Sequence, residues 1–164
     1  MKYRALMVLM LVGVAMTESG CNRDEPSRLV DRATTDMSIK GKRFRLWLAD
    51  NVDDQNAGLM HVTADQMAPL PGGIERGMLF VFEHPVRGSF WMKNTIIPLD
   101  IAYVATDGTV VAIYTMVPLD TRSNAYPPGA LYRFAIELSA NRLSGLGVKV
   151  GDRLEIPPSI LKRR

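Results

Sequence analysis

Apolar and polar positions alternate along the chain from Ser38 to Ala49. On an extended backbone this places two sets of side chains on opposite sides, Phe44, Leu46 and Leu48 against Arg43, Arg45 and Trp47. A period of two is typical of a strand with one buried side. The pattern therefore predicts a strand over residues 38–49.

Several other segments carry the same kind of signal. A short helix is expected at 53–60, where acidic residues in the first turn favour the helix dipole, and another at 140–146, closed by Gly147. Asp107-Gly108 predicts a tight hairpin, and 69–73 and 119–129 are expected to be loops. Further strands are predicted at 77–82, 89–92, 99–105, 110–116, 133–138 and 153–156. Many short strands separated by turns indicate a mainly β domain, a compact antiparallel barrel or sandwich with one or two short capping helices.

The first twenty residues have the pattern of a secretory signal. Lys2 and Arg4 precede an apolar stretch at 5–16, and small or polar residues follow up to Gly20. The apolar stretch is too short for a stable membrane-spanning helix. We expect residues 1–20 to be removed during export, which places the protein in the cell envelope, on the periplasmic side of a membrane.

Cys21 directly follows this segment and is the only cysteine of the chain. Its position resembles the processing box of bacterial lipoproteins, in which the cysteine is acylated and becomes the new amino terminus. Glu18 departs from that pattern because the place usually holds an aliphatic residue. Lipidation at Cys21 is the leading expectation, and ordinary cleavage with a free thiol is the alternative.

The polar composition of 21–36, which includes Pro26, predicts a tether between the anchor and the folded domain. The domain is expected to span residues 37–158, followed by a basic tail at 159–164. The chain has 20 basic and 17 acidic residues, scattered among one another, for a formal charge of +3. This near-balance of scattered charges predicts no basic surface of the kind that binds nucleic acid.

Four strings, at close spacing, resemble the signature of Domain of Unknown Function family 192 (DUF192). They are Gly58–Met60, Arg76–Phe82, Ser89–Thr95 and Pro98–Asp100. Ile136–Leu138 and Gly147–Asp152 resemble the second half of the same family. The resemblance implies a compact, mainly β domain, often exported and sometimes lipid-anchored, and it implies no activity. Ser139-Ala140-Asn141 departs from the Pro-Ala-Gly that usually follows Glu137-Leu138, although Asn tolerates a left-handed backbone nearly as Gly does.

The first candidate site lies within these strings. Trp91 and Lys93 share a side of an extended chain, Asn94 follows at a turn, and Asp100 begins the next predicted strand. An indole, an ammonium, an amide and a carboxylate together could bind a polar ligand, with Trp91 as a stacking platform. The alternative is structural: Asp100 accepts backbone N–H bonds from the Asn94 turn, and Lys93 neutralises its charge.

A second candidate is a soft-metal site. Thioethers suit Cu(I), and the strings contain or adjoin Met60, Met78, Met92 and His84. Methionine is also an adaptable core residue, and these methionines have apolar neighbours without tight clustering. Core packing is therefore the favoured interpretation, and no cofactor is expected.

Catalysis has the least support. Asp100 and Glu137 could serve as paired carboxylates in hydrolysis of an envelope polymer, but nothing in the sequence places them at a working separation. No catalytic residue is assigned. The sequence thus favours an extracytoplasmic, lipid-anchored module that binds a small ligand or an envelope protein, with Cu(I) binding as the alternative and hydrolysis as a distant third.

Overall fold

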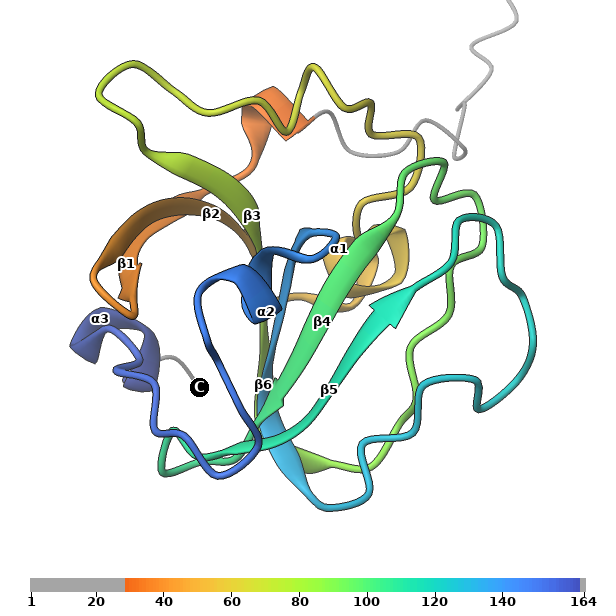
Figure 1. The fold of residues 1–164 in the computed structure, drawn as a ribbon. Helices are drawn as coiled ribbons and strands as arrows, with labels where there is room; N and C mark the ends of the chain where they lie inside the picture. Colours follow the sequence, from red (N-terminus) through yellow and green to blue (C-terminus); the bar gives the residue numbers. More distant parts are fainter. Residues whose placement is uncertain (1–28, 163–164) are drawn as a thin grey trace, which may run out of the picture.

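The computed structural model describes residues 29–162 and contains one six-stranded sheet (Figure 1). The strands are β1 (Thr34–Ile39), β2 (Lys42–Ala49), β3 (Glu75–Val86), β4 (Leu99–Val104), β5 (Val110–Met116) and β6 (Tyr132–Ser139). The helices are α1 (Val52–Ala57), α2 (Arg142–Gly145) and α3 (Pro158–Leu161), and a single 3₁₀ turn precedes β1 at Leu29–Asp31. The prediction of a mainly β fold with short helices is confirmed.

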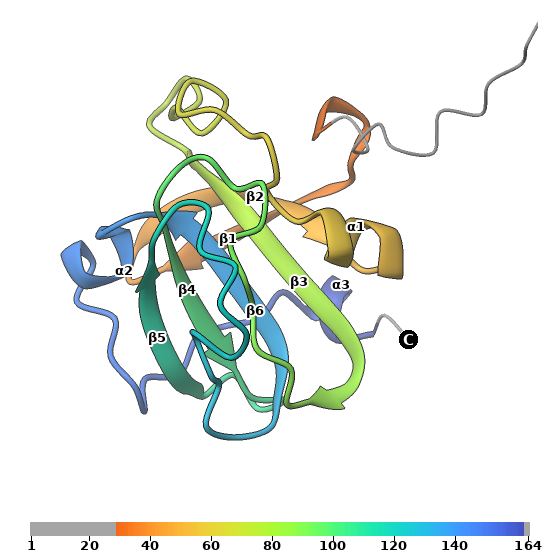
Figure 2. The same cartoon turned by 90° about the vertical axis from the view of Figure 1, so that its right-hand side faces the viewer.

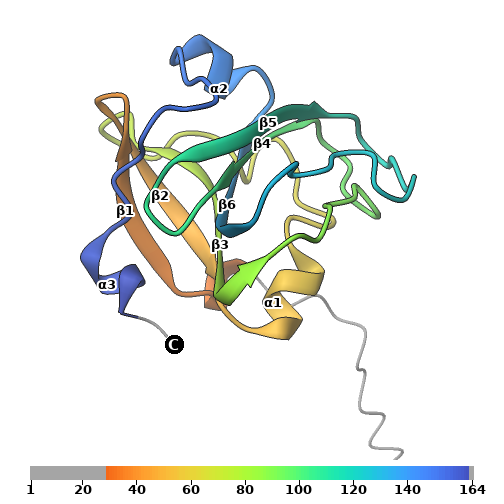
Figure 3. The same cartoon turned by 90° about the horizontal axis from the view of Figure 1, so that it is seen from below.

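The strand order is β1-β2-β3-β6-β4-β5, and the sheet is mixed. β2 and β3 run parallel, whereas the other neighbours are antiparallel. The expectation of a purely antiparallel arrangement is therefore wrong at one pair. A parallel pair needs a crossover, and residues 50–74, which include α1, supply it. The sheet is strongly curved, as seen from below in Figure 3, and β1 and β5 remain its two edges.

The predicted strand at 38–49 is in fact a hairpin of β1 and β2. Lys40 and Gly41 form its turn with φ of 48° and 79°. Two consecutive positive φ values are those of a type I′ turn, the usual two-residue hairpin connection. Lysine is uncommon at such a position, so the break was hard to predict from the residue types alone.

Two other predicted strands are absent from the described residues. Residues 89–92 form only an isolated bridge, Phe90 to Tyr126, and residues 153–156 form only the bridge of Arg153 to Thr109. The chain ends instead in α3, with Pro158 in its first turn and Ile160 buried. The expected tail at 159–164 is thus partly helical, and Arg163 and Arg164 lie outside the described residues.

Loops and short helices cover both faces of the sheet (Figure 2). An apolar core lies beneath each covering layer. The C-terminal core lies under the segment 143–160 and contains Phe44, Leu46, Leu79, Ala102, Ile136, Leu143 and Ile160 among others. The loop-side core lies under the loops 57–68, 87–98 and 117–126 and contains Trp47, Met67, Met78, Met92, Leu99, Tyr103 and Met116 among others. Alternate residues of the central strands therefore enter different cores.

The folded domain begins earlier than expected. β1 starts at Thr34, and the buried Arg32 lies before it with Nε 3.0 Å from Oδ1 of Asp54 in α1. Residues 29–36, assigned to the tether, are therefore part of the domain. The predicted signal segment, Cys21 and the rest of the tether lie outside the described residues. Within 29–162 no helix has the length and apolar composition needed to cross a bilayer.

Candidate functional site

Trp91 and Lys93 flank a methionine that fixes their turn to the protein. Met92 is fully buried in the loop-side core, and its carbonyl accepts a hydrogen bond from the Thr95 amide at 3.1 Å. Asn94 occupies the left-handed position of this turn, with φ 55°. Trp91 is 51% exposed, and the Lys93 ammonium lies 5.3 Å from the centre of its indole ring. The indole and the ammonium are thus presented outward as a pair.

Three loops meet at this turn. The Met92 amide donates to the Asp120 carbonyl at 2.8 Å, and the Leu119 amide donates to the Thr95 carbonyl at 3.0 Å. The His61 amide donates to the Asn94 carbonyl at 2.8 Å. These bonds hold the loops 57–68, 87–98 and 117–126 together, and in Figure 1 the second and third run side by side on the right of the molecule.

Large apolar side chains are exposed where these loops meet. We define the loop face as Trp91, Lys93, Ile96, Val117 and Leu119. Its four apolar members are each about half exposed or more. Monomeric proteins rarely leave several large apolar side chains together in water unless they bind something.

A side-chain network rigidifies the third loop. The Asp120 carboxylate accepts from Arg122 Nε at 2.9 Å and Nη2 at 2.6 Å, and from the Tyr126 hydroxyl at 2.8 Å. The same hydroxyl accepts from the Val117 amide at 2.9 Å. The bonds from Arg122, and then that from Tyr126, hold the pKa of Asp120 well below its usual range. The loop is therefore fixed on both sides of Leu119.

Leu119 adopts an unfavourable backbone conformation although its side chain is exposed to solvent. Its φ is 60°, and its side chain is 58% exposed. A left-handed backbone costs a residue with a Cβ about 1–2 kcal/mol. No burial of the leucine side chain compensates for this strain within the described domain. Strain of this kind is frequently retained at binding sites.

The structure does not bring Asp100 to this turn. Along β4 the side chains of Leu99, Ile101 and Tyr103 enter the loop-side core, so Asp100 enters the opposite, C-terminal side. Its carboxylate is 1% exposed and accepts from Thr115 Oγ1 at 2.7 Å and from the amides of Asn141 at 2.9 Å and Leu143 at 2.8 Å. The anchoring role considered for Asp100 is thus real, but its donors belong to the start of α2 and not to the Asn94 turn.

The carboxylate pair considered for hydrolysis is likewise separated. Glu137 lies opposite Ile101 on the neighbouring strand, on the loop side of the sheet, whereas Asp100 lies opposite Leu138 on the other side. Glu137 is 4% exposed, and burial raises its pKa to about 8. The two carboxyl groups face different cores and share no site.

The residues of the proposed soft-metal site are also dispersed. Met78 and Met92 are fully buried in the loop-side core, and the Met78 sulfur is 3.7 Å from Arg32 Nη1. Met60 is half-buried in the turn after α1, whereas His84 is exposed on β3. Six residues of extended chain separate His84 from Met78, about 20 Å. No group of three or more His, Cys, Asp or Glu residues arranged for a metal occurs within 29–162.

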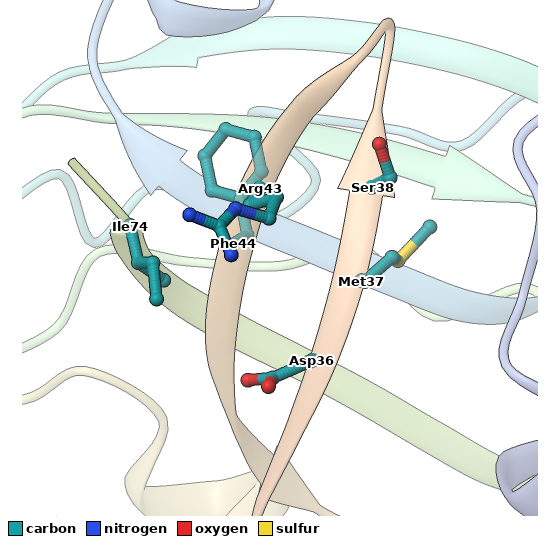
Figure 4. A pocket seen from close by; sticks show the side chains of 6 residues that line it. All are labelled: Asp36, Met37, Ser38, Arg43, Phe44 and Ile74. Atoms are coloured by element: carbon teal, nitrogen blue, oxygen red, sulfur yellow. The ribbon is translucent and has the colours of Figure 1, made fainter. Parts of the chain in front are cut away.

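Three of the cavities of the described domain lie away from Trp91, Lys93 and Asn94. One, of about 230 Å³, lies at the β1–β2 hairpin and is lined by Asp36, Met37, Ser38, Arg43, Phe44 and Ile74 (Figure 4). Its carboxylate is already paired, because Asp36 accepts two hydrogen bonds from Arg45. A second, of about 630 Å³, lies between the 106–108 turn and the segment 153–161. The third, of about 280 Å³, lies at the start of β3.

Sequence reasoning found the Trp91–Asn94 turn but missed Ile96, Val117 and Leu119. The available signal was the apolar run Val117-Pro118-Leu119, which leads into the surface loop expected at 119–129. Their proximity to Trp91 depends on loop-to-loop hydrogen bonds, for which the sequence contains no periodic signal.

The fold and the loop face define a small β domain with large apolar side chains exposed on one set of loops. The chain belongs to the DUF192 family, described as "Uncharacterized ACR, COG1430", whose model matches residues 34–156. The resemblance seen in the sequence is thereby confirmed. A search of curated proteins finds no significant match.

The solved structures similar to this chain include the following two. One is a protein of unknown function from Novosphingobium aromaticivorans DSM 12444, with 33% identity and a TM-score of 0.60, covering 75% of this chain and 83% of that one. The other is a "putative transcription regulator" from Sinorhizobium meliloti 1021, with 32% identity and a TM-score of 0.59, covering 76% of this chain and 94% of that one.

Proposed function

We propose that the protein is an extracytoplasmic, lipid-anchored module that binds an envelope protein through the loop face. The observation that carries this proposal is the strained, exposed Leu119 beside the exposed Trp91 on loops held rigid by backbone hydrogen bonds. A preformed surface loses little conformational entropy when it binds. The lipid at Cys21 would hold this surface close to the membrane.

A macromolecular partner fits the loop face better than a small ligand does. Small-molecule sites are concave and close around their ligand, whereas the loop face presents four apolar side chains that are each about half exposed or more. An aromatic side chain with aliphatic neighbours and a polar rim is the usual composition of a protein–protein contact. Lys93, Asn94 and Arg122 supply that rim.

The charges of the three loops favour a protein over a lipid surface or a nucleic acid. Arg87, Lys93 and Arg122 are opposed by Asp65 and Asp120, which leaves a small net charge. Electrostatic attachment to anionic lipid or to nucleic acid needs a denser cluster of basic residues. The description of the Sinorhizobium protein as a regulator is therefore not extended to this chain.

Photo-crosslinking in living cells tests the proposal. A photoreactive amino acid at position 119 of the otherwise native chain should give one discrete protein adduct after illumination. The same group at Val150, which is equally exposed but outside the three loops, should not give that adduct. Trp91→Ala, introduced with the group at 119, should abolish the adduct, because the aromatic anchor is lost.

Three outcomes would contradict the proposal. They are adducts to lipid alone, the same adducts from positions 119 and 150, and a protein adduct that survives Trp91→Ala.

A further inference from the structure

The cavity at the start of β3 has features of a binding site and is separate from the loop face. It measures about 280 Å³ and is lined by Met67, Pro69, Glu75, Arg76, Ser139 and Arg142. These residues come from the crossover before β3, from β3 itself, from the end of β6 and from α2. The β3–β6 pairing places the start of β3 beside the end of β6, which brings Arg76 close to Ser139.

Arg76 is the distinctive residue of this cavity. Its guanidinium carbon lies 4.3 Å from the centre of the Trp47 ring, so the indole holds the group in place. Its Nε is buried and has no hydrogen-bond partner, the single buried side-chain nitrogen or oxygen of the described residues in that condition. Leaving such a donor unsatisfied is costly, and a ligand oxygen would remove the cost.

The charge of Arg76 is also uncompensated. None of the ion pairs of the described residues includes it, and Arg45 lies directly opposite it on β2. Burial, and then the charge of Arg45, lower the pKa of Arg76. Glu137 shares this side of the sheet but forms no ion pair with Arg76.

The other two charged residues that line the cavity, Glu75 and Arg142, form an ion pair with each other. Arg142 donates to Glu75 twice, from Nε at 2.5 Å and from Nη2 at 2.6 Å, and Lys42 Nζ lies 3.3 Å from Glu75 Oε1. Glu75 and Arg142 therefore cancel, and Arg76 leaves the lining with one positive charge in excess.

We propose that this cavity binds a small organic monocarboxylate, with its carboxylate on Arg76 and Ser139 and its hydrocarbon part against Met67 and Pro69. The planar guanidinium suits the two oxygens of a carboxylate. The apolar walls give room for a short hydrocarbon chain. This site is independent of the loop face and of any partner bound there.

Butyrate is the probe, with butyramide as its uncharged counterpart and inorganic phosphate as a second anion. The mature chain from residue 21, with Cys21→Ser to prevent lipidation and Trp91→Phe, leaves Trp47 as its single tryptophan. Butyrate should change Trp47 fluorescence saturably at millimolar concentrations and shift one arginine Nε–H signal in the NMR spectrum. Butyramide and phosphate should do neither at the same concentrations.

Variants assign the effect to Arg76. Arg76→Met should weaken butyrate binding at least about tenfold, because a charged hydrogen-bond donor is lost. Arg153→Met, which removes an equally charged but exposed arginine far from this cavity, should bind butyrate as the parent does. Arg76→Lys keeps the positive charge but lacks the planar guanidinium group, so it should also weaken butyrate binding. This variant tests the proposal if Arg76→Met fails to fold.

The proposal is overturned if butyrate gives no saturable change in the parent chain, or if Arg76→Met and Arg76→Lys bind butyrate unchanged. Saturable binding of phosphate that is tighter than that of butyrate would overturn the assignment to monocarboxylates. Leu119→Asp should leave butyrate binding intact, so failure here and failure of the proposed partner contact can be told apart.

Discussion

Asp100 and Glu137 differ by one residue in strand register, and this difference places their carboxyl groups on opposite faces of the sheet. Both are buried, and they occupy adjacent strands. Asp100 faces the C-terminal side and accepts three hydrogen bonds, two of them from backbone amides at the start of α2. Glu137 faces the loop-side core, where burial favours its protonated form. The two residues therefore respond to substitution in different ways.

Asp100→Asn should lower the free energy of unfolding by about 2–3 kcal/mol. The amide that replaces one carboxylate oxygen carries hydrogen atoms that would point at backbone N–H donors. Denaturant titration of both proteins measures the difference. Asp65→Asn, at an exposed position, should change nothing and serves as the control. A variant as stable as the parent would show that Asp100 does not anchor α2.

Glu137 should make the protein less stable as the pH rises. Its pKa is about 8 in the folded protein, against 4.5 as the ordinary value, so between these values the folded state holds a proton that the unfolded state has released. Because the unfolded state binds fewer protons there, the free energy of unfolding falls with rising pH across that window.

Glu137→Gln removes this dependence. Urea titrations at about pH 5 and about pH 8 should show a larger loss of stability for the parent than for the variant. All other ionisable groups are common to both proteins, so the difference between the two profiles isolates Glu137. Parallel profiles would contradict the assignment.

At the scale of elements, many individual strands and turns could be predicted from the sequence, but which strands and loops lie beside one another could not. Alternation identified β2 but missed most of β1 and the turn at Lys40-Gly41, whereas Asn94 correctly marked the turn after Trp91. The face of Asp100 was not predictable, because the number of residues in an irregular loop does not fix the side of the sheet on which the next strand resumes. The same limit hid the proximity of Leu119 to Trp91 and of Arg76 to Ser139, which depends on long-range contacts.

The Leu119 loop offers a test of strain kept for binding. Leu119→Ala and Leu119→Gly both remove the exposed side chain, but glycine alone tolerates φ of 60° without a penalty. The glycine variant should be more stable than the alanine variant by about 1 kcal/mol in thermal or urea unfolding. Equal stabilities would show that the backbone at 119 carries no strain.

Both Leu119 variants should also reduce crosslinking to the partner from a photoreactive group at Ile96. We expect both variants to fold normally but to bind the partner less well, because only the exposed side chain is removed. Undiminished crosslinking would place Leu119 outside the contact.

For the whole molecule, the lipid anchor that we propose at Cys21 would determine where the loop face acts. Cys21→Ser should abolish incorporation of labelled palmitate and move the protein from the membrane fraction to the soluble envelope fraction, because each buried methylene contributes about 0.8 kcal/mol to membrane attachment. Glu18→Leu should increase the lipidated fraction if processing at this box is slow. Retention of the Cys21→Ser protein in membranes would contradict attachment by the lipid.

The central position of β3 has a consequence for how the chain acquires its structure. β3 is flanked by β2 and β6, and its residue Met78 pairs with Glu137, 59 positions later in the sequence. Chains dominated by such distant pairings fold slowly. No amino-terminal portion can complete the middle of the sheet before residue 139 is present. A chain that lacks β6 therefore cannot close the middle of its sheet, and a chain in that state would suit the export that we propose.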